Sequence, residues 1–272
     1  MTSRREQATT YAILGVFSLL ALLPIVGIVF TALQDPGSGA GFGRLGGFHP
    51  GNFADAWDQG NFGSYLKSSL IVAAVVVSVS SLLSIMAGYA FGMMRFRGSE
   101  TLFYVILLGL MVPTEAIVVP LYYDFRDLSL TNTYWALILP QIGTSVAFGT
   151  FWMRTFFRAV PRSLVEAARI DGASSWLTLW RVLLPLAKPA VLTMCLLLFM
   201  WTWNEFLLAL VMVSDEGLRT APLGLSFFQG RNSSDLSLLA AGAVIVATPV
   251  VVLYVFLQRH FIRGMVSGAV KG

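Results

Sequence analysis

The sequence predicts an all-α membrane protein with six transmembrane helices, and three observations support this fold class. The 272-residue chain is 56% hydrophobic and only 12% charged, with a mean hydropathy of +0.75. A soluble domain carries about 25% charged residues, so this chain has too few to cover the surface of a globule. Its apolar residues also gather into long runs, and its basic residues favour alternate connecting segments. These features exclude a soluble enzyme, a disordered protein and a disulfide-stabilised scaffold.

Six stretches without Lys or Arg are long enough to cross a bilayer, whose apolar core of about 30 Å needs roughly 20 helical residues. In chain order they cover residues 11–33, 69–94, 102–122, 134–152, 190–212 and 236–257. Each is too long for a buried strand and is apolar on all sides, which favours a membrane helix. The first run exceeds the apolar core of a signal peptide, about 7–15 residues, so we expect it to remain as a span. Residues 1–272 then form one membrane domain.

The distribution of basic residues predicts the orientation. Six spans put both termini on one side of the membrane. Of the 18 Lys and Arg residues, those on the opposite side are Arg44, Lys67, Arg126, Arg219 and Arg231, and the other thirteen share the side of the termini. Because segments rich in Lys and Arg stay in the cytoplasm, both termini are predicted to be cytoplasmic. The basic charge is thus a mark of topology, so we expect membrane lipid and no nucleic acid as a partner.

The cytoplasmic segment 153–189 is long for a connection between two spans, and its first half predicts a short helix. Pro161 and Ser163 are typical of a helix start. The apolar residues of this helix are Leu164, Val165, Ala168 and Ile170. Asp171-Gly172 predicts its end, because glycine accepts the left-handed conformation that closes a helix.

The second half of this segment predicts another short helix after the turn. Ser174 or Ser175 can cap its start, and we expect Pro185 and Pro189 to break it. Physical reasoning leaves two functions open for the pair of helices and the elbow between them. They can dock into a groove of a soluble partner, or they can lie in the lipid headgroups as an anchor.

A spaced motif in the same segment resembles a known family. The motif reads Glu166-Ala167-Ala168, three residues, Gly172, nine residues and then Val182 to Pro185. This pattern is similar to the EAA motif of ABC-importer permeases. Every spacing matches, and Val182 stands where the motif has isoleucine. Further similar stretches are residues 111–122, 132–135, 201–206 and 263–272. The resemblance covers about residue 52 to the end, and it is closest to the shorter permease of carbohydrate importers of the maltose type.

The resemblance implies a role for each motif residue, and it favours docking over anchoring. In the family, the elbow is a coupling helix seated in a cleft of the ATPase subunit. Carried over to this chain, Glu166 points at a cationic group of the ATPase. Ala167 and Ala168 allow close approach, Asp171 braces the turn and Gly172 forms it.

The resemblance also implies the partners and the location. These are a second, longer permease subunit, two ATPase subunits, an extracytoplasmic solute-binding protein and a carbohydrate substrate, in a bacterial or archaeal cytoplasmic membrane. ATP and magnesium belong to the ATPase subunits. The chain itself contains no G-x-x-x-x-G-K-[ST] motif. We therefore expect no catalytic residues, no metal and no cofactor on this chain, which is not an enzyme.

A few polar and aromatic residues inside the spans are candidates for a translocation path. Charges at mid-membrane are costly and usually face the interior of a helix bundle. The candidates are Glu115, between two prolines, and the cluster Trp201, Trp203, Asn204 and Glu205. Aromatic rings, amides and carboxylates are the groups that bind sugars. The same residues can instead make polar and packing contacts with the partner permease.

Three further expectations remain. The tail, with Gly268 and Lys271, either frays or contacts the ATPases, as the resemblance implies. Gly88 and Gly92, four residues apart, predict close helix packing, most simply within the pair of permeases. Two other functions stay open: an ABC permease for a non-sugar solute, and a stand-alone secondary transporter, which would leave the elbow unexplained.

Overall fold

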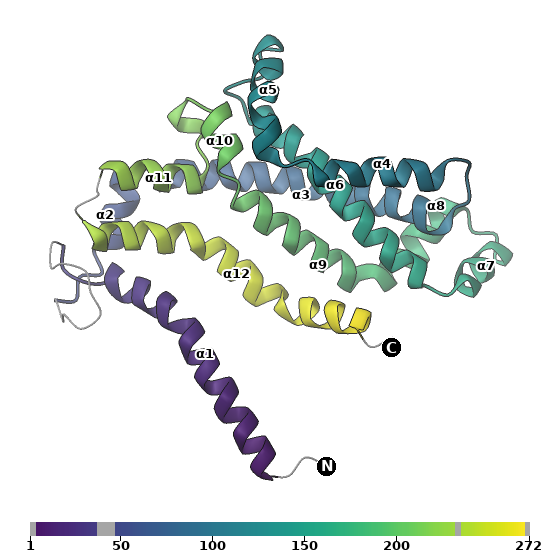
Figure 1. Ribbon diagram of the computed structural model, residues 1–272, viewed down its shortest axis with the longest axis horizontal. Coiled ribbons are helices and arrows are strands. Elements are labelled where there is room, and N and C mark those ends of the chain that lie inside the picture. Colours follow the sequence, from purple (N-terminus) through teal and green to yellow (C-terminus); the bar gives the residue numbers. More distant parts are fainter. Residues whose placement is uncertain (1–3, 37–46, 232–234, 270–272) are drawn as a thin grey trace. The chain divides into compact units, whose positions relative to one another are not determined.

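The protein is all helical in the computed structural model, which describes residues 4–36, 47–231 and 235–269 (Figure 1). In this described part, β pairing is limited to one isolated bridge between Gln34 and Phe48. The chain divides into two compact units. One holds residues 1–63 and 224–248, and the other holds residues 64–223 and 249–272. The predicted all-α class is confirmed.

The first unit contains α1 (Arg4–Ala32), α2 (Asn52–Gln59) and the start of α12 (Leu236–Ala269). Asn52 joins the first two of these helices. Its side-chain amide donates to the carbonyl oxygens of Ala32 at 2.9 Å and Gln34 at 2.7 Å. The last turn of a helix leaves carbonyls without helical partners, so the buried Asn52 completes the end of α1.

The second unit contains most of α3 (Phe62–Met93) and the helices that surround it. These are α4 (Ser99–Met111), α5 (Thr114–Asp127), α6 (Tyr134–Ala159), α7 (Arg162–Ile170), α8 (Ser175–Leu177), the π-helix η1 (Thr178–Leu183), α9 (Leu184–Trp203), α10 (Leu207–Met212), the 3-10 turn η2 (Glu216–Leu218) and the start of α11 (Ala221–Arg231). One core cluster joins α3, α5, α6 and α10. A second joins α3, α6, α7, η1 and α9. The helix α6 contributes to both clusters.

Five described helices are long and apolar enough to cross a bilayer, and the α4–α5 pair adds a sixth if its two parts count as one span. This pair differs from the straight span predicted at 102–122, because its halves meet at an angle of 94°. The break lies at Val112 and Pro113, both in extended conformation. A proline disfavours helical geometry in the residue before it, which explains why α4 ends there.

The helix after the elbow also differs from expectation. We expected Pro185 and Pro189 to break it, yet the helical segment runs from Ser175 to Trp203. The N–H of Leu184 bonds to the carbonyl of Leu179, five residues back, in the wide turn of η1. Pro185 follows directly after this wide turn, whose changed hydrogen-bond register lets the helix continue past a residue without an N–H. The expected break is thus wrong. The helix is interrupted instead between α9 and α10, inside the span predicted at 190–212.

The predicted close packing at Gly88 and Gly92 occurs within this chain. A Cβ atom on Gly88 would collide with the Cβ of Met153 and lie 2.9 Å from the backbone nitrogen of Arg154. A Cβ on Gly92 would lie 3.0 Å from the Cβ of Phe157. The two glycines therefore let α3 and α6 approach closely, which supplies a partner for them without a second subunit.

Candidate functional site

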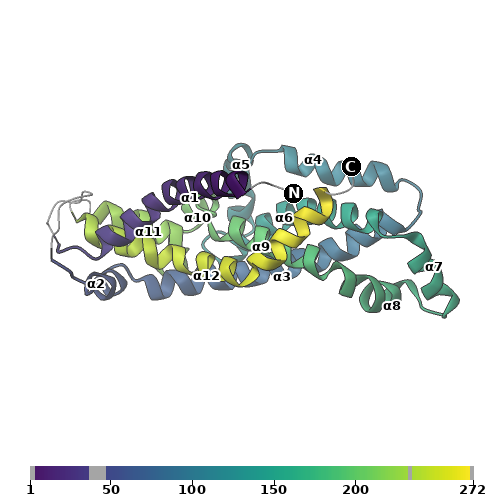
Figure 2. The ribbon, with the colours of Figure 1, turned by 90° about the horizontal axis from the view of Figure 1, so that it is seen from below.

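The elbow predicted from residues 161–185 lies at one end of the second unit. Both views place α7 and α8 beyond the ends of the long helices α3 and α9 (Figures 1 and 2). The chain leaves α6 at Val160, turns through Pro161 into α7 and returns through α8 and η1 into α9. The loop is therefore a projection carried by two long helices.

The turn at Gly172 is a Schellman motif, which ends a helix by hydrogen-bonding its last carbonyls. The N–H of Ala173 donates to the carbonyl of Ala168 at 2.9 Å, and the N–H of Gly172 donates to that of Arg169 at 3.0 Å. Gly172 has φ +79°, a left-handed conformation that costs other L-residues about 1–2 kcal/mol. The sequence prediction of a glycine elbow is confirmed in these details.

The start of the second helix is also fixed by hydrogen bonds. The hydroxyl of Ser174 accepts from the N–H of Leu177 at 3.3 Å, and the hydroxyl of Thr178 donates to the Ser174 carbonyl at 3.0 Å. Of the two serines predicted as caps, Ser174 is the one that caps. Both sides of the elbow are thus held by local bonds, which makes the turn a stiff joint.

The α7 helix has one face against the protein and one face exposed. Val165 and Ala168 are buried, and Val165 belongs to the cluster of α6, η1 and α9. Glu166, Ala167 and Asp171 are exposed. The structure therefore brings three of the predicted docking residues to the outer face, while Ala168 packs inward.

Two large apolar residues on this projection were not predicted from the sequence as docking residues. Ile170 is 86% exposed and Trp176 is 60% exposed, on either side of the Gly172 turn. The sequence pattern counts Ile170 only as one of the apolar residues of its helix. Its position next to the turn, off the face of Val165 and Ala168, is the signal that could have placed it outward.

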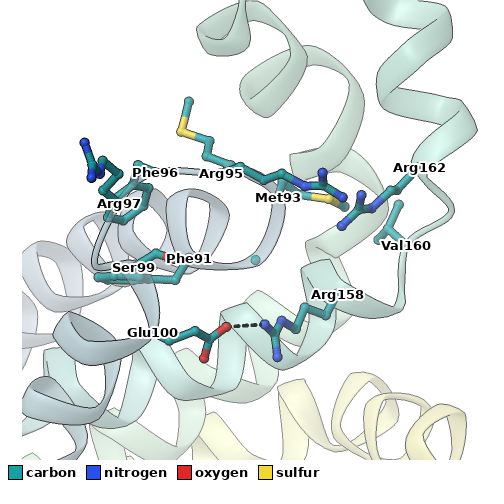
Figure 3. A pocket seen from close by; sticks show the side chains of 12 residues that line it. Phe91, Met93, Arg95, Phe96, Arg97, Ser99, Glu100, Arg158, Val160 and Arg162 are labelled. Atoms are coloured by element: carbon teal, nitrogen blue, oxygen red, sulfur yellow. Dashed lines mark hydrogen bonds and ion pairs between the residues drawn. The ribbon is translucent and has the colours of Figure 1, made fainter.

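An ionic cluster fastens the base of this projection (Figure 3). Both oxygens of Glu100, in the first turn of α4, accept hydrogen bonds from Arg154 at 2.7 and 2.8 Å. Arg158, one turn further along α6, bonds to the same carboxylate at 2.7 Å. The Arg154 side chain is only 10% exposed and stacks 3.6 Å from the Phe103 ring centre. The cluster joins α4 to the end of α6 that leads into α7.

The candidate path acids lie at the two breaks in the spans. Glu115 is exposed in the first turn of α5, directly after the bend at Pro113. Glu205 lies in the gap between α9 and α10, and its carboxylate accepts the N–H of Leu208 at 2.8 Å. Acidic groups are favourable at helix N-termini, where backbone N–H groups are unpaired. Because α5 and α10 share one core cluster, both acids belong to neighbouring broken helices.

The aromatic candidates separate into one outward and one buried residue. Trp201 is 51% exposed and contacts Phe148 edge to face, with ring centres 4.6 Å apart. Trp203 is buried and stacks on Phe199 at 5.3 Å. Asn204 is exposed and donates to the Met200 carbonyl at 2.7 Å. The structure thus gathers Trp201 and Asn204 at the surface near Glu205, and it places Trp203 in the core.

The remaining site predictions fall near the end of the chain. Gly268 lies in the last turns of α12, which ends at Ala269. Lys271 lies outside the described residues. Across the part of the chain that the structure describes, no three His, Cys, Asp or Glu side chains gather as metal ligands would.

Comparison with known proteins gives a family and a fold. Residues 80–267 match the family model described as "Binding-protein-dependent transport system inner membrane component". The chain is 32% identical to the trehalose transport system permease protein SugB of Mycobacterium tuberculosis, over 98% of this chain and 99% of that one. It is 30% identical to the diacetylchitobiose uptake system permease protein NgcG of Streptomyces coelicolor, over 98% of this chain and 89% of that protein.

A solved structure shares the fold over nearly the whole length. It is a chain of a bacterial ABC transporter involved in the import of the acidic polysaccharide alginate, with a TM-score of 0.79 and 24% identity. The match covers 96% of this chain and 99% of that one. The family match includes the Gly172 elbow and the breaks at Pro113 and Asn204.

Proposed function

Because this chain belongs to the family of binding-protein-dependent transport system inner membrane components, it is a permease subunit of an ABC importer, and we propose that its solute is a carbohydrate. The names of similar proteins support this solute class. The permeases of Mycobacterium and Streptomyces are named for trehalose and for diacetylchitobiose. A third, 35% identical over 78% of this chain and 77% of its own, is the trehalose/maltose permease MalG of Thermococcus litoralis.

The transport cycle needs a mechanical link from the ATPases to the path, and one observation carries our proposal for it. The helical segment Ser175–Trp203 begins three residues after the Gly172 elbow and ends beside Asn204 and Glu205. At 1.5 Å per residue it is about 40 Å long, enough to reach across a membrane. Movement of the elbow is therefore transmitted along one continuous helix to the candidate path.

The elbow is the part of this link that receives the force. In the proposal, ATP closes two partner ATPase subunits, which bind ATP and magnesium, and their clefts hold the exposed face of α7. Glu166 and Asp171 supply charge, Ala167 allows close approach, and Ile170 and Trp176 add apolar contact. The buried Val165 packs in one cluster with residues of α6 and α9, so α7 cannot move without these helices.

The path itself is assigned to the two broken spans. Discontinuous helices in transporters expose polar backbone groups near the membrane midplane, where solutes bind. The breaks at Pro113 and at Asn204–Phe206 have this character, since each has an acid at the start of the following helix. We assign Glu115, Trp201, Asn204 and Glu205 to the path, while Trp203 is buried against Phe199 and is not assigned to it.

The surroundings of the chain complete the proposal. A second, longer permease covers the exposed path residues, and an extracytoplasmic binding protein delivers the solute to the side of residues 213–235. Both termini lie in the cytoplasm. The C-terminal tail, with Gly268 and Lys271, reaches toward the ATPases.

Replacement of Gly172 tests the coupling assignment. Gly172→Ala should reduce ATP-driven uptake of a radiolabelled disaccharide by proteoliposomes at least tenfold, because the left-handed turn is strained in any other residue, by about 1–2 kcal/mol, and the joint loses its geometry. Gly172→Asp should abolish uptake while the chain still inserts and binds the second permease. Uptake is measured beside ATP hydrolysis, which should continue without transport.

The chain offers a matched control for this experiment. Gly98, before α4, has φ +80°, and a Cβ atom added there would meet no atom within 4 Å, as at Gly172. Gly98→Ala therefore introduces the same backbone strain away from the elbow. It should keep most of the uptake. Equal loss in both variants would show that strain, and not the elbow, is responsible.

The fold alone does not select the solute. A chain of the methionine importer MetNI also shares it, with a TM-score of 0.50 over 72% of this chain. Competition of disaccharide uptake by unlabelled sugars and amino acids therefore tests the solute class. Uptake that needs ATP and survives a protonophore excludes a secondary transporter, and competition by an amino acid alone would overturn the carbohydrate proposal.

A further inference from the structure

A basic cavity lies where α3 ends and α4 begins, beside the start of α7 (Figure 3). Its volume is about 720 Å³. Four arginines from three segments line it: Arg95 and Arg97 from the α3–α4 loop, Arg158 from α6 and Arg162 from α7. It is separate from the candidate path, which lies at the breaks of the spans.

The charge of the cavity is unbalanced. Glu100 is the one acid in its lining, and Arg154 and Arg158 already bind both of its oxygens. Within the described part of the chain, the other three lining arginines make no hydrogen bond or ion pair through their side chains. Of these, Arg95 and Arg162 point toward one another, whereas Arg97 points away from them (Figure 3). Two guanidinium groups that face each other repel unless an anion lies between them, and arginine pairs with phosphate through two parallel hydrogen bonds.

The cavity also has an apolar side. Phe91 and Phe96 line it with ring centres 5.6 Å apart, together with Met94. Phe96 is 40% exposed and Met94 is 39% exposed. Met94 and Phe96 follow directly after the apolar helix α3, and side chains just past the end of a membrane span are expected where headgroups meet acyl chains. A small water-soluble anion would leave this apolar surface uncovered, whereas a phospholipid has a phosphate for the arginines and acyl chains for the apolar side.

We propose that this cavity binds the phosphate group of an anionic phospholipid. Arg95 and Arg162 contact the phosphate, and Phe96 and Met94 contact the glycerol and the first carbons of the acyl chains. Basic pockets between transmembrane helices at an interface bind lipids of this kind. The inference rests on the proposed membrane insertion of α3 and α4 but not on the solute.

The site lies at the base of the coupling joint. Arg162 is the first residue of α7, and Arg158 lies in the last turn of α6. A lipid bound here would tie the start of α7 to the α3–α4 loop. The lipid thereby becomes a part of the structure against which the elbow moves.

The test measures lipid binding by the full chain, purified with its partner subunits in neutral detergent. Dioleoyl-phosphatidylglycerol is titrated and its adducts are counted by native mass spectrometry. Each basic group near a phosphate is worth about 1 kcal/mol, so Arg95→Gln with Arg162→Gln should raise the Kd roughly 30-fold. Arg95→Gln alone changes one exposed loop residue, leaves the core intact and should raise the Kd about fivefold.

The control removes two charges elsewhere on the same predicted side. Arg4 and Arg181 are exposed and do not line the cavity. Arg4→Gln with Arg181→Gln should leave the Kd within about twofold, and dioleoyl-phosphatidylcholine should bind all variants alike.

Four results would overturn the proposal. Equal weakening in both double variants would mean a general basic surface, and no weakening would mean that lipid binds elsewhere. Displacement of the lipid by an equal concentration of inorganic phosphate would mean a site for free phosphate. Loss of the ATPase subunits with unchanged lipid binding would mean that the cavity holds a protein segment. None of these results bears on the permease assignment, and the coupling proposal is tested separately by uptake in the Gly172 variants.

Discussion

Asn132 shows how much a single residue contributes to the arrangement of the broken spans. It has φ +59°, a left-handed conformation that asparagine tolerates better than most residues. Its side-chain oxygen accepts from the N–H groups of Ser214 and Asp215 at 3.1 and 2.8 Å, and its own N–H donates to Met212 at 2.8 Å. It therefore fastens the loop before α6 to the end of α10. In the sequence, Asn132 belongs to a family-like stretch but has no evident role, because its partners lie about eighty residues away.

Substitution of Asn132 should separate its two contributions. Asn132→Gly keeps the backbone conformation and loses two bonds of about 1 kcal/mol each. Asn132→Leu loses the same bonds and adds left-handed strain of about 1–2 kcal/mol. We expect the thermal unfolding midpoint, followed by tryptophan fluorescence in detergent, to fall in the order native, glycine, leucine. Asn132→Asp keeps the acceptor oxygen, so its unfolding midpoint should stay near that of the native protein. A midpoint as low as that of Asn132→Leu would refute the role of this oxygen as an acceptor.

The structure also explains why two acidic residues, Glu115 and Glu205, are tolerated inside the predicted spans. The sequence identified Glu115 and Glu205 only as costly charges. In the structure each lies at the start of a helix that follows a break, and Glu205 accepts a backbone N–H there. The unpaired N–H groups of a helix start offset part of the cost of a carboxylate. The two acids thus stabilise the breaks as well as being candidates for solute contact.

At the scale of elements, composition predicted the long helices but not where they are interrupted. Apolar runs of about 20 residues leave little choice but a membrane helix, so α1, α3, α6 and α12 match their predicted runs closely. The elbow was predictable too, because a glycine and a serine cap are local signals. The break after Trp203 has no proline or glycine at it, and α10 is held by its packing with α5. Such contacts between distant residues are not visible in one sequence.

The contact between α3 and α6 is the element-scale feature most open to a direct test. Gly88→Ala places a methyl group against Met153 and the backbone of Arg154, so one helix must shift. We expect a loss of about 1–3 kcal/mol in stability, the usual cost of overpacking. Thermal unfolding in detergent measures it.

Gly109 in α4 is the matched control for this change, since a methyl group there meets no atom within 4 Å. Gly109→Ala should leave stability unchanged or raise it by up to about 1 kcal/mol, because alanine favours a helix. Identical behaviour of the two alanine variants would argue against close packing at Gly88.

For the whole molecule, the positions of the few charged residues say more about topology than their small number does. Exposed apolar side chains cover much of the long helices, as a chain surrounded by lipid and partner subunits requires. The basic residues gather at the ends of α3, α6 and α7, around the elbow and the arginine-lined cavity. One end of the second unit therefore combines the proposed coupling joint with the residues that predict the cytoplasmic side.

The predicted orientation can be tested because the chain has one cysteine. Cys195 bonds to Ser81 inside the bundle and can be replaced by alanine. In that background, Ser214→Cys should react with a membrane-impermeant maleimide in intact spheroplasts. Ser163→Cys, on the elbow, should react only after the membrane is permeabilised. The opposite pattern would invert the topology and remove the elbow from the ATPases.

The π-helix η1 holds one extra residue in the helix between the elbow and α9. A π-turn holds one more residue than an α-turn, and each residue of an α-helix advances by about 100° around the axis. Because the wide turn takes up its extra residue within a single turn, deletion of one residue within Thr178–Leu183 would leave a regular helix and keep Gly172 and α7 at nearly the same angle about the α9 axis. Deletion of one residue in the regular part of α9 would instead rotate them by about 100°. The wide turn is therefore the place in this helix where the chain tolerates a change of length without turning the proposed docking face.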